Sequence, residues 1–158
     1  FTVAQALTAA ANIHKAYTGK AIDTAGAANW YDPYVNYCVA NGIITANQFA
    51  DYNKNITRGE MCELAVYAFE KATGNDIDMS NETFSGFTDT SDQNIIKAHL
   101  YGIVNGYEDG SFRPNQLLTR QEFFKLIENF CTAAALGWRR VTIRETWSLT
   151  RISRAPRG

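Results

Sequence analysis

Three segments of the chain place apolar residues in one helical register, each directly after a polar pattern typical of helix starts. The starts are Thr2-Val3-Ala4-Gln5, Thr57-Arg58-Gly59-Glu60 and Thr119-Arg120-Gln121-Glu122. In each, the Thr hydroxyl can accept from the backbone N–H three residues on, and the Gln or Glu side chain can accept from the N–H of the Thr. We therefore predict capping boxes built on Thr2, Thr57 and Thr119, with Glu60 and Glu122 as the returning acceptors.

The residues four, seven, eight and eleven positions after each Thr are all apolar. They are Ala6, Ala9, Ala10 and Ile13, then Met61, Leu64, Ala65 and Ala68, then Phe123, Leu126, Ile127 and Phe130. A stripe at helical period predicts an amphipathic helix in each segment. Gly19 and Gly74 are expected to end the first two helices, because Gly adopts the left-handed cap at low cost. The shared register indicates an internal repeat.

A second pattern precedes the last two helix starts. It consists of an aromatic residue, an Asp two residues later, a short apolar helix pattern and a Gly. The two copies run from Trp30 through Asp32 to Gly42, and from Phe87 through Asp89 to Gly102. Asp32 and Asp89 are predicted as helix caps. The repeat unit is thus a short helix, a loop and a longer capped helix, and the predicted fold class is mainly α.

Composition and charge exclude some functions. Apolar residues make up 46% of the 158-residue chain, and no apolar run approaches the roughly 18 residues needed to cross a bilayer, so no membrane insertion is expected. Residues 1–138 hold nine Lys and Arg against fifteen Asp and Glu, hence −6, whereas residues 139–158 hold six Arg against one Glu, hence +5. The mildly acidic body argues against nucleic-acid binding.

The chain shows no catalytic or metal-binding pattern. Cys38, Cys62 and Cys131 are widely spaced within helical apolar patterns, so we predict small core residues and no zinc site or disulfide framework. A calcium loop near Asn105 fails because Tyr107 occupies the third ligand position and Gln116 replaces the closing Glu. We therefore expect neither an enzyme nor a protein with a cofactor or metal.

Residues 87–123 resemble an S-layer homology motif nearly from end to end. The most specific part is Gly102-Ile103-Val104-Asn105-Gly106-Tyr107, followed by Gly110-Ser111-Phe112-Arg113-Pro114-Asn115 and by Thr119-Arg120-Gln121-Glu122. The segment from Trp30 to Met61 resembles a second motif with a shortened loop, and residues 1–20 resemble the second half of a first motif. This resemblance predicts a first half-motif at 1–20, a second motif at 21–74 and a third at 84–133. After Gly137 the chain holds six Arg and no Lys, which matches nothing in the family, and this change in composition predicts an Arg-rich, poorly ordered tail at 136–158.

The resemblance implies a pseudo-threefold helical bundle of repeated helix-loop-helix motifs with short extended segments and with grooves between neighbouring motifs. Such grooves in the family bind secondary cell-wall polysaccharide, often through a pyruvylated amino sugar that carries a carboxylate. The family's Arg contact corresponds here to Arg58 and Arg120. Trp30, Asn105, Gly106 and Tyr107 are further candidate glycan contacts. The expected role is a non-catalytic anchor of a larger secreted protein, in the cell wall or S-layer of a Gram-positive, clostridial-type bacterium.

The residues alone leave the role of the two Arg open. An Arg in the first turn of a helix lies at the positive end of the helix dipole, where its charge is slightly unfavourable. An anionic ligand would explain that position, since a guanidinium fork, the helix terminus and loop amides all favour a carboxylate. Alternatively, each Arg pairs with a nearby acid such as Glu60 or Glu122. A helical protein–protein module of a surface assembly is the alternative to wall binding.

The first helix start departs from the other two. Val3 stands where they have Arg, so that start can still cap a helix but cannot contact an anion through a guanidinium. The second motif has Ile43-Ile44-Thr45-Ala46 in place of the Asn-Gly-Tyr loop. We therefore expect at most two working grooves.

Overall fold

The computed structural model of the protein describes residues 1–80 and 82–135. Four helices are α1 (Val3–Thr18), α2 (Asp32–Ala40), α3 (Arg58–Thr73) and α4 (Gln93–Leu100). Residues 120–135 are also helical and are called the third long helix below. Within the described ranges there is no strand, and two isolated antiparallel bridges join Thr2 to Asn55 and Thr57 to Leu117. The mainly helical fold class is as predicted, and the predicted tail at 136–158 lies outside the described residues.

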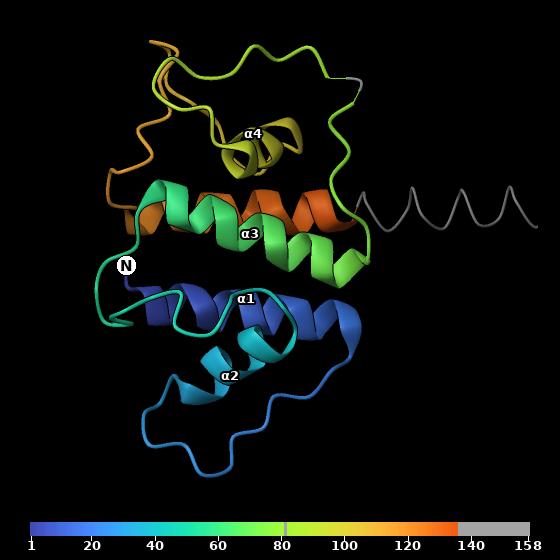
Figure 1. Cartoon of the computed structure of the whole chain (residues 1–158), viewed down its shortest axis with the longest axis vertical. Coiled ribbons are helices and arrows are strands. Elements are labelled where there is room, and N and C mark those ends of the chain that lie inside the picture. The colour runs from blue at the N-terminus through green and yellow to red at the C-terminus, as the bar shows by residue number, and fades with distance from the viewer. Residues whose placement is uncertain (81, 136–158) are drawn as a thin grey trace, which may run out of the picture.

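The long helices pack together and the short ones cover them. Figure 1 shows α1 and α3 side by side, with α2 against the outer side of α1 and α4 against that of α3. The third long helix touches both of the others. Its Phe130 ring meets the Phe69 ring of α3 edge-on, with centroids 6.2 Å apart, and its Cys131 carbonyl accepts from the Tyr17 hydroxyl of α1 at 3.3 Å. A threefold symmetry relating the units stays a prediction.

The three long helices begin with the same hydrogen bonds. The Thr2, Thr57 and Thr119 hydroxyls each accept, at 3.2 Å, from the backbone N–H three residues on. The Gln5, Glu60 and Glu122 side chains accept in return from the N–H of the Thr at 2.9–3.0 Å. At the other ends, α1 and α3 stop at left-handed glycines, Gly19 with φ of 72° and Gly74 with φ of 71°. Local sequence thus fixes both ends of α1 and α3.

The predicted apolar stripe forms the centre of the core. Nine of its twelve residues are buried, and Ala9, Ile13 and Ile127 are partly buried and pack against the core. Burial of such a stripe, at roughly 25 cal/mol per Å² of apolar surface, is the main stabilising contribution to helices that are individually marginal in water.

The turns that follow the short helices also repeat. Gly42 and Gly102 have φ of 71° and 72°. After each, the next residue donates its N–H to a carbonyl of the short helix at 2.9 Å, Ile43 to Cys38 and Ile103 to Ala98. The second and third units therefore share turn geometry as well as sequence pattern.

Two predicted caps are wrong. The cap of α2 is Tyr31, and Asp32 is the first residue of the helix; its carboxylate accepts from the backbone N–H of Asn29 at 2.8 Å. The cap of α4 is Asp92, whose carboxylate accepts from Asn94 and Ile95. Asp89 instead accepts from the N–H groups of Phe112 and Arg113, at 2.8 and 2.7 Å. Each Asp therefore satisfies loop amides, which compete with helix ends for short carboxylate side chains.

One predicted core residue is also wrong. Cys38 and Cys62 are buried, and burial raises the pKa of both thiols to about 12, which makes them unreactive. Cys131 of the third long helix is exposed.

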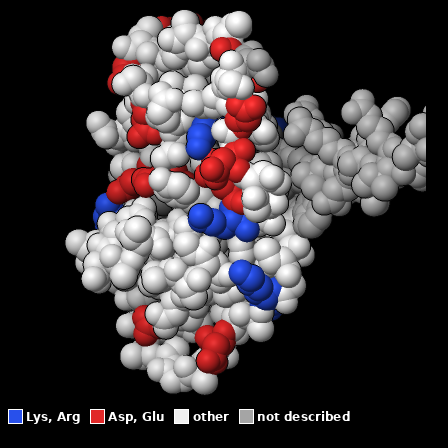
Figure 2. All heavy atoms as spheres, turned by 45° about the vertical axis from the view of Figure 1, so that its right-hand side comes forward, with Lys and Arg blue, Asp and Glu red and all other residues white. Residues whose placement is uncertain are grey.

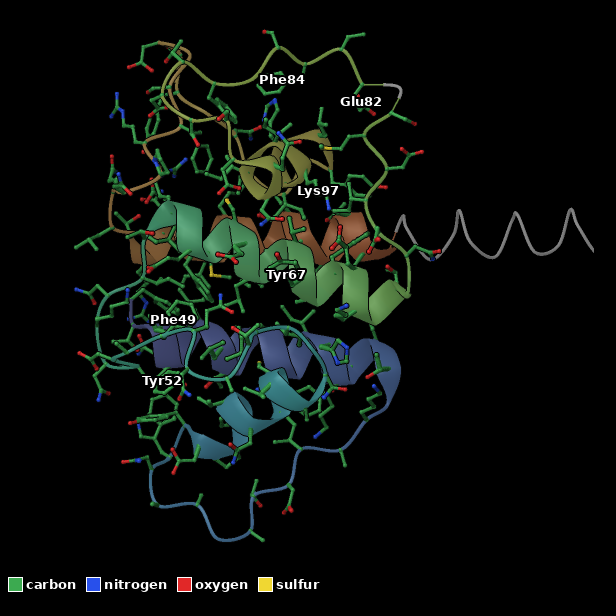
Figure 3. All side chains as sticks on the ribbon, viewed as in Figure 1. Phe49, Tyr52, Tyr67, Glu82, Phe84 and Lys97 are labelled. Carbon is green, nitrogen blue, oxygen red and sulfur yellow. The ribbon has the colours of Figure 1, made fainter. Side chains whose placement is uncertain are left out.

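Charged groups tie elements together rather than gathering in one patch. Lys97 of α4 donates to the buried carboxylate of Glu70 on α3 at 2.8 Å, and Figure 3 shows Lys97 at this helix junction. The face in Figure 2 carries both acidic and basic side chains, and some of the two kinds adjoin each other at mid-height. No described helix is long and apolar enough to cross a membrane, and no group of three or more metal-ligating side chains occurs among the described residues.

A buried histidine predicts a loss of stability in mild acid. His14 of α1 is 1% exposed, and its Nδ1 lies 2.8 Å from the Tyr37 hydroxyl of α2. Burial holds the pKa of His14 below its ordinary value of 6.5, and the nearby Lys20 charge acts in the same direction. Because the unfolded chain takes up this proton first, the free energy of unfolding should fall as the pH drops below 6.5.

Urea unfolding between pH 5 and pH 8 measures this dependence. A His14→Gln variant should show a smaller slope over the same range. Equal slopes for the two proteins would contradict the assignment to His14.

Candidate functional site

The start of α3 is crossed by the loop of the following unit. The N–H groups of Arg58 and Gly59 donate to the carbonyls of Gln116 and Pro114, both at 2.9 Å. The start of α1 repeats this arrangement, with Val3 donating to Lys54 and Ala4 to Tyr52. The first helical amides of α3 are therefore already satisfied. The prediction that the helix-terminus amides help to hold an anion is wrong for α3.

The guanidinium of Arg58 is held by three hydrogen bonds and two aromatic rings. The residue is 8% exposed. Its Nε donates to the Phe112 carbonyl at 3.0 Å, Nη1 to Glu122 Oε1 at 3.0 Å and Nη2 to the Asn105 carbonyl at 3.2 Å. The rings of Tyr107 and Phe112 lie 4.9 and 4.6 Å from its Cζ. Arg58 of the second unit is thus fixed inside the loop of the third.

Glu122 connects the hydrogen bonds of Arg58 to the start of the third long helix. One carboxylate oxygen accepts from Arg58 and, at 3.2 Å, from the Tyr107 hydroxyl, while the other accepts from the N–H of Thr119. Burial alone raises the pKa of Glu122, but the hydrogen bonds from Thr119, the Arg58 charge and the Tyr107 hydroxyl together bring it below its ordinary value. Glu122 is therefore ionised at neutral pH and stays paired with Arg58.

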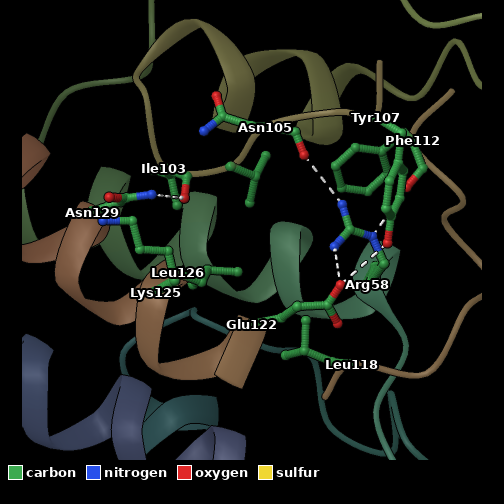
Figure 4. Close-up of a pocket in the computed structure, with 11 residues that line it drawn as sticks. Arg58, Ile103, Asn105, Tyr107, Phe112, Leu118, Glu122, Lys125, Leu126 and Asn129 are labelled. Carbon is green, nitrogen blue, oxygen red and sulfur yellow. Dashed lines mark hydrogen bonds and ion pairs between the residues drawn. The ribbon is translucent and has the colours of Figure 1, made fainter. Parts of the chain in front are cut away.

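A pocket of about 240 Å³ opens beside this ion pair (Figure 4). It lies between the second and third units, since α3, the 103–118 loop and the third long helix all supply side chains. Its floor is apolar and its rim is polar. The lining residues are Arg58, Ile103, Val104, Asn105, Tyr107, Phe112, Leu118, Glu122, Lys125, Leu126 and Asn129.

Some of the predicted glycan contacts line the pocket and others do not. Arg58, Asn105 and Tyr107 line the pocket. The Tyr107 hydroxyl, however, already bonds Glu122 and accepts from the Gln116 side chain at 3.3 Å. Trp30 lies outside the pocket, 58% exposed, with its ring edge-on to that of Tyr31.

Gly106 does not line the pocket but shapes its wall. A Cβ added to Gly106 would lie 2.4 Å from Cε1 of Phe87 and 3.0 Å from the Ser111 carbonyl. Only a residue without a side chain lets the loop pass this closely.

Replacing Gly106 with Ala should destabilise the protein by about 1–3 kcal/mol, the usual cost of an overpacked site. Thermal unfolding measures the change, with Glu108→Ala as an exposed control in the same loop. A Gly106→Ala protein as stable as this control would show that the loop adjusts freely.

Arg120 has a different environment from Arg58. It is exposed, outside the pocket, with its Cζ 5.6 Å from the ring of Phe124. Among residues 1–80 and 82–135, no loop carbonyl accepts from the N–H of Arg120 or Gln121, whereas such carbonyls cover the starts of α1 and α3. The predicted contact at Arg120 stays a prediction.

The sequence reasoning missed two polar groups of the pocket, Lys125 and Asn129. Asn129 donates to the Ile103 carbonyl at 3.2 Å, and Lys125 pairs with Glu128 at 3.1 Å. A signal was present, because Glu122, Lys125 and Asn129 are spaced three and four residues apart and so share one helix face. This polar face runs beside the apolar stripe of the same helix.

The S-layer homology domain family matches residues 87–124. "Cell surface glycoprotein 1" of Acetivibrio thermocellus is 34% identical over 84 residues, which are 50% of this chain and 4% of that protein. An "Endoglucanase" of Bacillus sp. is 27% identical over 106 residues, which are 63% of this chain and 11% of that protein. No solved structure matches the chain significantly.

The aligned part of the chain is thus a small fraction of each of these two relatives. The family match covers the short helix α4, the pocket loop and the start of the third long helix. It contains the motifs that carried the resemblance in the sequence. Residues 87–124 are therefore similar to an S-layer homology domain, and the two relatives extend the similarity over 50% and 63% of the chain.

Proposed function

We propose that this chain anchors a larger protein to the bacterial cell wall by binding an acidic wall polysaccharide in the pocket beside Arg58. The family match and the cell-surface relative support cell-wall anchoring in general. The proposed ligand is a secondary wall polymer with a pyruvylated amino sugar, which carries a carboxylate.

The unused hydrogen-bonding capacity of Arg58 is the observation that carries the proposal. A guanidinium has five N–H donors, and Arg58 uses three of them within the described residues. One N–H remains on each terminal nitrogen. In Figure 4 the bonds to Asn105 and Glu122 leave these nitrogens in diverging directions, and the edge between them faces the side where Ile103, Leu126 and Asn129 lie. This edge suits a carboxylate, which takes two parallel N–H bonds.

The apolar floor supports a sugar as the carrier of that carboxylate. Val104, Leu118 and Leu126 line the pocket next to the guanidinium. A pyranose ring has one face of C–H groups that packs on apolar side chains, while its hydroxyl groups bond polar groups at the rim. The exposed Asn105 side chain and Asn129 are placed to meet such hydroxyl groups.

A fixed guanidinium also lowers the cost of binding. The three hydrogen bonds and two aromatic rings hold Arg58 in one geometry before any ligand arrives, so little side-chain entropy is lost on association. Each charge-assisted hydrogen bond to the ligand then contributes about 1.5–3 kcal/mol. The ion pair with Glu122 thus positions Arg58 for the ligand. Arg58 therefore has both of the roles that the sequence left open, pairing with an acid and contacting an anionic ligand.

A protein–protein role is favoured by one other observation. Leu117 and Phe124 are large apolar side chains, 52% and 56% exposed, and Phe124 adjoins Arg120. Contiguous exposed apolar patches commonly mark contact surfaces. Leu117 and Phe124 lie outside the pocket, so the two functions can be separated by mutation.

Sedimentation with isolated Gram-positive cell walls tests the proposed function. The whole chain should bind intact walls, lose binding when the acidic polymer is extracted, and bind weakly to walls whose polymer lacks pyruvate. A Phe124→Ser variant should bind as the parent does. Binding that survives extraction, or that depends on Phe124 alone, would favour the protein-interaction role instead.

A further inference from the structure

Lys125 is a second cation on the pocket, on the wall formed by the third long helix (Figure 4). It lies one helical turn after Glu122 and next to Leu126 of the pocket floor. Its ammonium pairs with Glu128 at 3.1 Å, and both side chains are well exposed, at 65% and 69%. No aromatic ring or loop carbonyl holds Lys125 among the described residues, in contrast to Arg58.

The charges around the pocket give Lys125 a distinct role. Arg58 is paired with Glu122, which is ionised and fixed by Thr119 and Tyr107. The fixed part of the site is therefore close to neutral, and an approaching carboxylate meets the Glu122 charge as well as the guanidinium. The anion needs a further cation that is free to turn towards it.

The pair between Lys125 and Glu128 is weak enough to be exchanged. Exposed ion pairs three residues apart on a helix contribute about 0–1 kcal/mol, because water screens them and two long side chains must be ordered. An ammonium on a four-carbon stem can reorient at low cost. A ligand carboxylate over the pocket can thus replace the Glu128 carboxylate as the partner of Lys125.

We propose that Lys125 is a specificity-determining contact that supplies the net positive charge for an acidic glycan, and that Glu128 competes with the ligand for it. This inference rests on the proposed function of the pocket. Arg58 then orients the acidic group through a fixed fork, whereas Lys125 discriminates acidic from neutral polymer. Binding releases Glu128 to solvent.

The test measures the affinity of the whole chain for acidic polysaccharide extracted from Gram-positive walls, at low and at physiological salt. Lys125→Met should weaken binding roughly tenfold at low salt and reduce the salt dependence, since one charge contact is lost. Glu128→Gln should strengthen binding by about two- to fivefold, because the competing carboxylate is gone. In a Lys125→Met background, Glu128→Gln should have no effect.

Two controls and one altered probe complete the design. Lys15→Met and Glu82→Gln remove the same charges outside the pocket and should leave the affinity unchanged. With carboxyl-reduced polysaccharide as the probe, Lys125→Met should bind as well as the parent.

The outcomes separate this inference from the proposed function. If the parent binds, and neither Lys125→Met nor Glu128→Gln changes the affinity beyond its control, the inference is overturned and the function stands. A Glu128→Gln variant that binds more weakly than the parent would also overturn it, since Glu128 would then support the ligand. Failure of the parent to bind the polysaccharide would overturn both proposals.

Discussion

An Arg58→Lys variant is expected to bind acidic wall polysaccharide at least tenfold more weakly than the parent. Lys keeps the positive charge but has three N–H donors in place of five, so it cannot replace the bonds to Phe112, Glu122 and Asn105 and also offer two parallel N–H groups to the ligand. The loss of one or more charge-assisted hydrogen bonds, each about 1.5–3 kcal/mol, corresponds to a factor of ten or more. Isothermal titration with the extracted polymer measures the change.

Arg113 provides a matched control for this experiment. Its guanidinium also lies over the Tyr107 ring, 3.9 Å from the centroid, but it pairs with the exposed Asp109 and does not line the pocket. Arg113→Lys should therefore keep the affinity of the parent. Helical content and urea unfolding of both variants show whether the fold is retained. A folded Arg58→Lys protein with full affinity would contradict the proposed contact.

The second large effect is expected on stability, from Glu122→Gln. Gln can serve a capping box, as Gln5 does at the start of α1, so the helix cap is preserved. The charge that faces the buried guanidinium of Arg58 is lost. Leaving a buried charge without its partner is costly, and we expect the free energy of unfolding to fall by about 1.5–3 kcal/mol.

The repeat supplies the control, because Glu60 occupies the equivalent position at the start of α3. Glu60 pairs with Lys54, whose side chain is 43% exposed, so Glu60→Gln should cost well under about 1 kcal/mol. Urea unfolding at neutral pH compares the two variants. Equal losses for Glu60→Gln and Glu122→Gln would show that the cap alone, and not the pair with Arg58, gives Glu122 its importance.

The sequence was sufficient for the features that depend on neighbouring residues. The Thr-to-Glu spacing specifies hydrogen bonds within one helical turn, and the helices begin at those residues. The glycines at 19 and 74 have the left-handed backbone that the pattern requires. The apolar register predicted the core because side chains at helical spacing necessarily share a face.

The features that depend on distant segments were not predictable in this way. The sequence pattern predicts Asp89 as a cap, yet its carboxylate accepts from two backbone amides more than twenty residues away. The amides at the start of α3 were expected to be free, but the loop of the next unit crosses them. Cys131 shares an apolar pattern with buried residues, and its exposure depends on which segments cover the third long helix.

In the candidate site, too, some residues were predictable from local sequence and others depend on distant segments. Arg58, Asn105 and Tyr107 stood out by motif, and the fold brings them together on one pocket. Lys125 and Asn129 carry no motif, and their importance comes from the loop packed against their helix face. Trp30 is a candidate only because aromatic rings stack on sugars, and it does not line the pocket.

The most direct test of the pocket as the glycan site is a backbone amide NMR titration of the whole chain with the extracted acidic polysaccharide. The largest shift changes should fall on residues 103–107 and on Glu122, Lys125 and Asn129, with smaller ones at Arg58, whose amide bonds the Gln116 carbonyl. Changes should be small at Trp30 and at the exposed Leu117 and Phe124. Changes centred on those exposed apolar residues, with the pocket unaffected, would contradict the account.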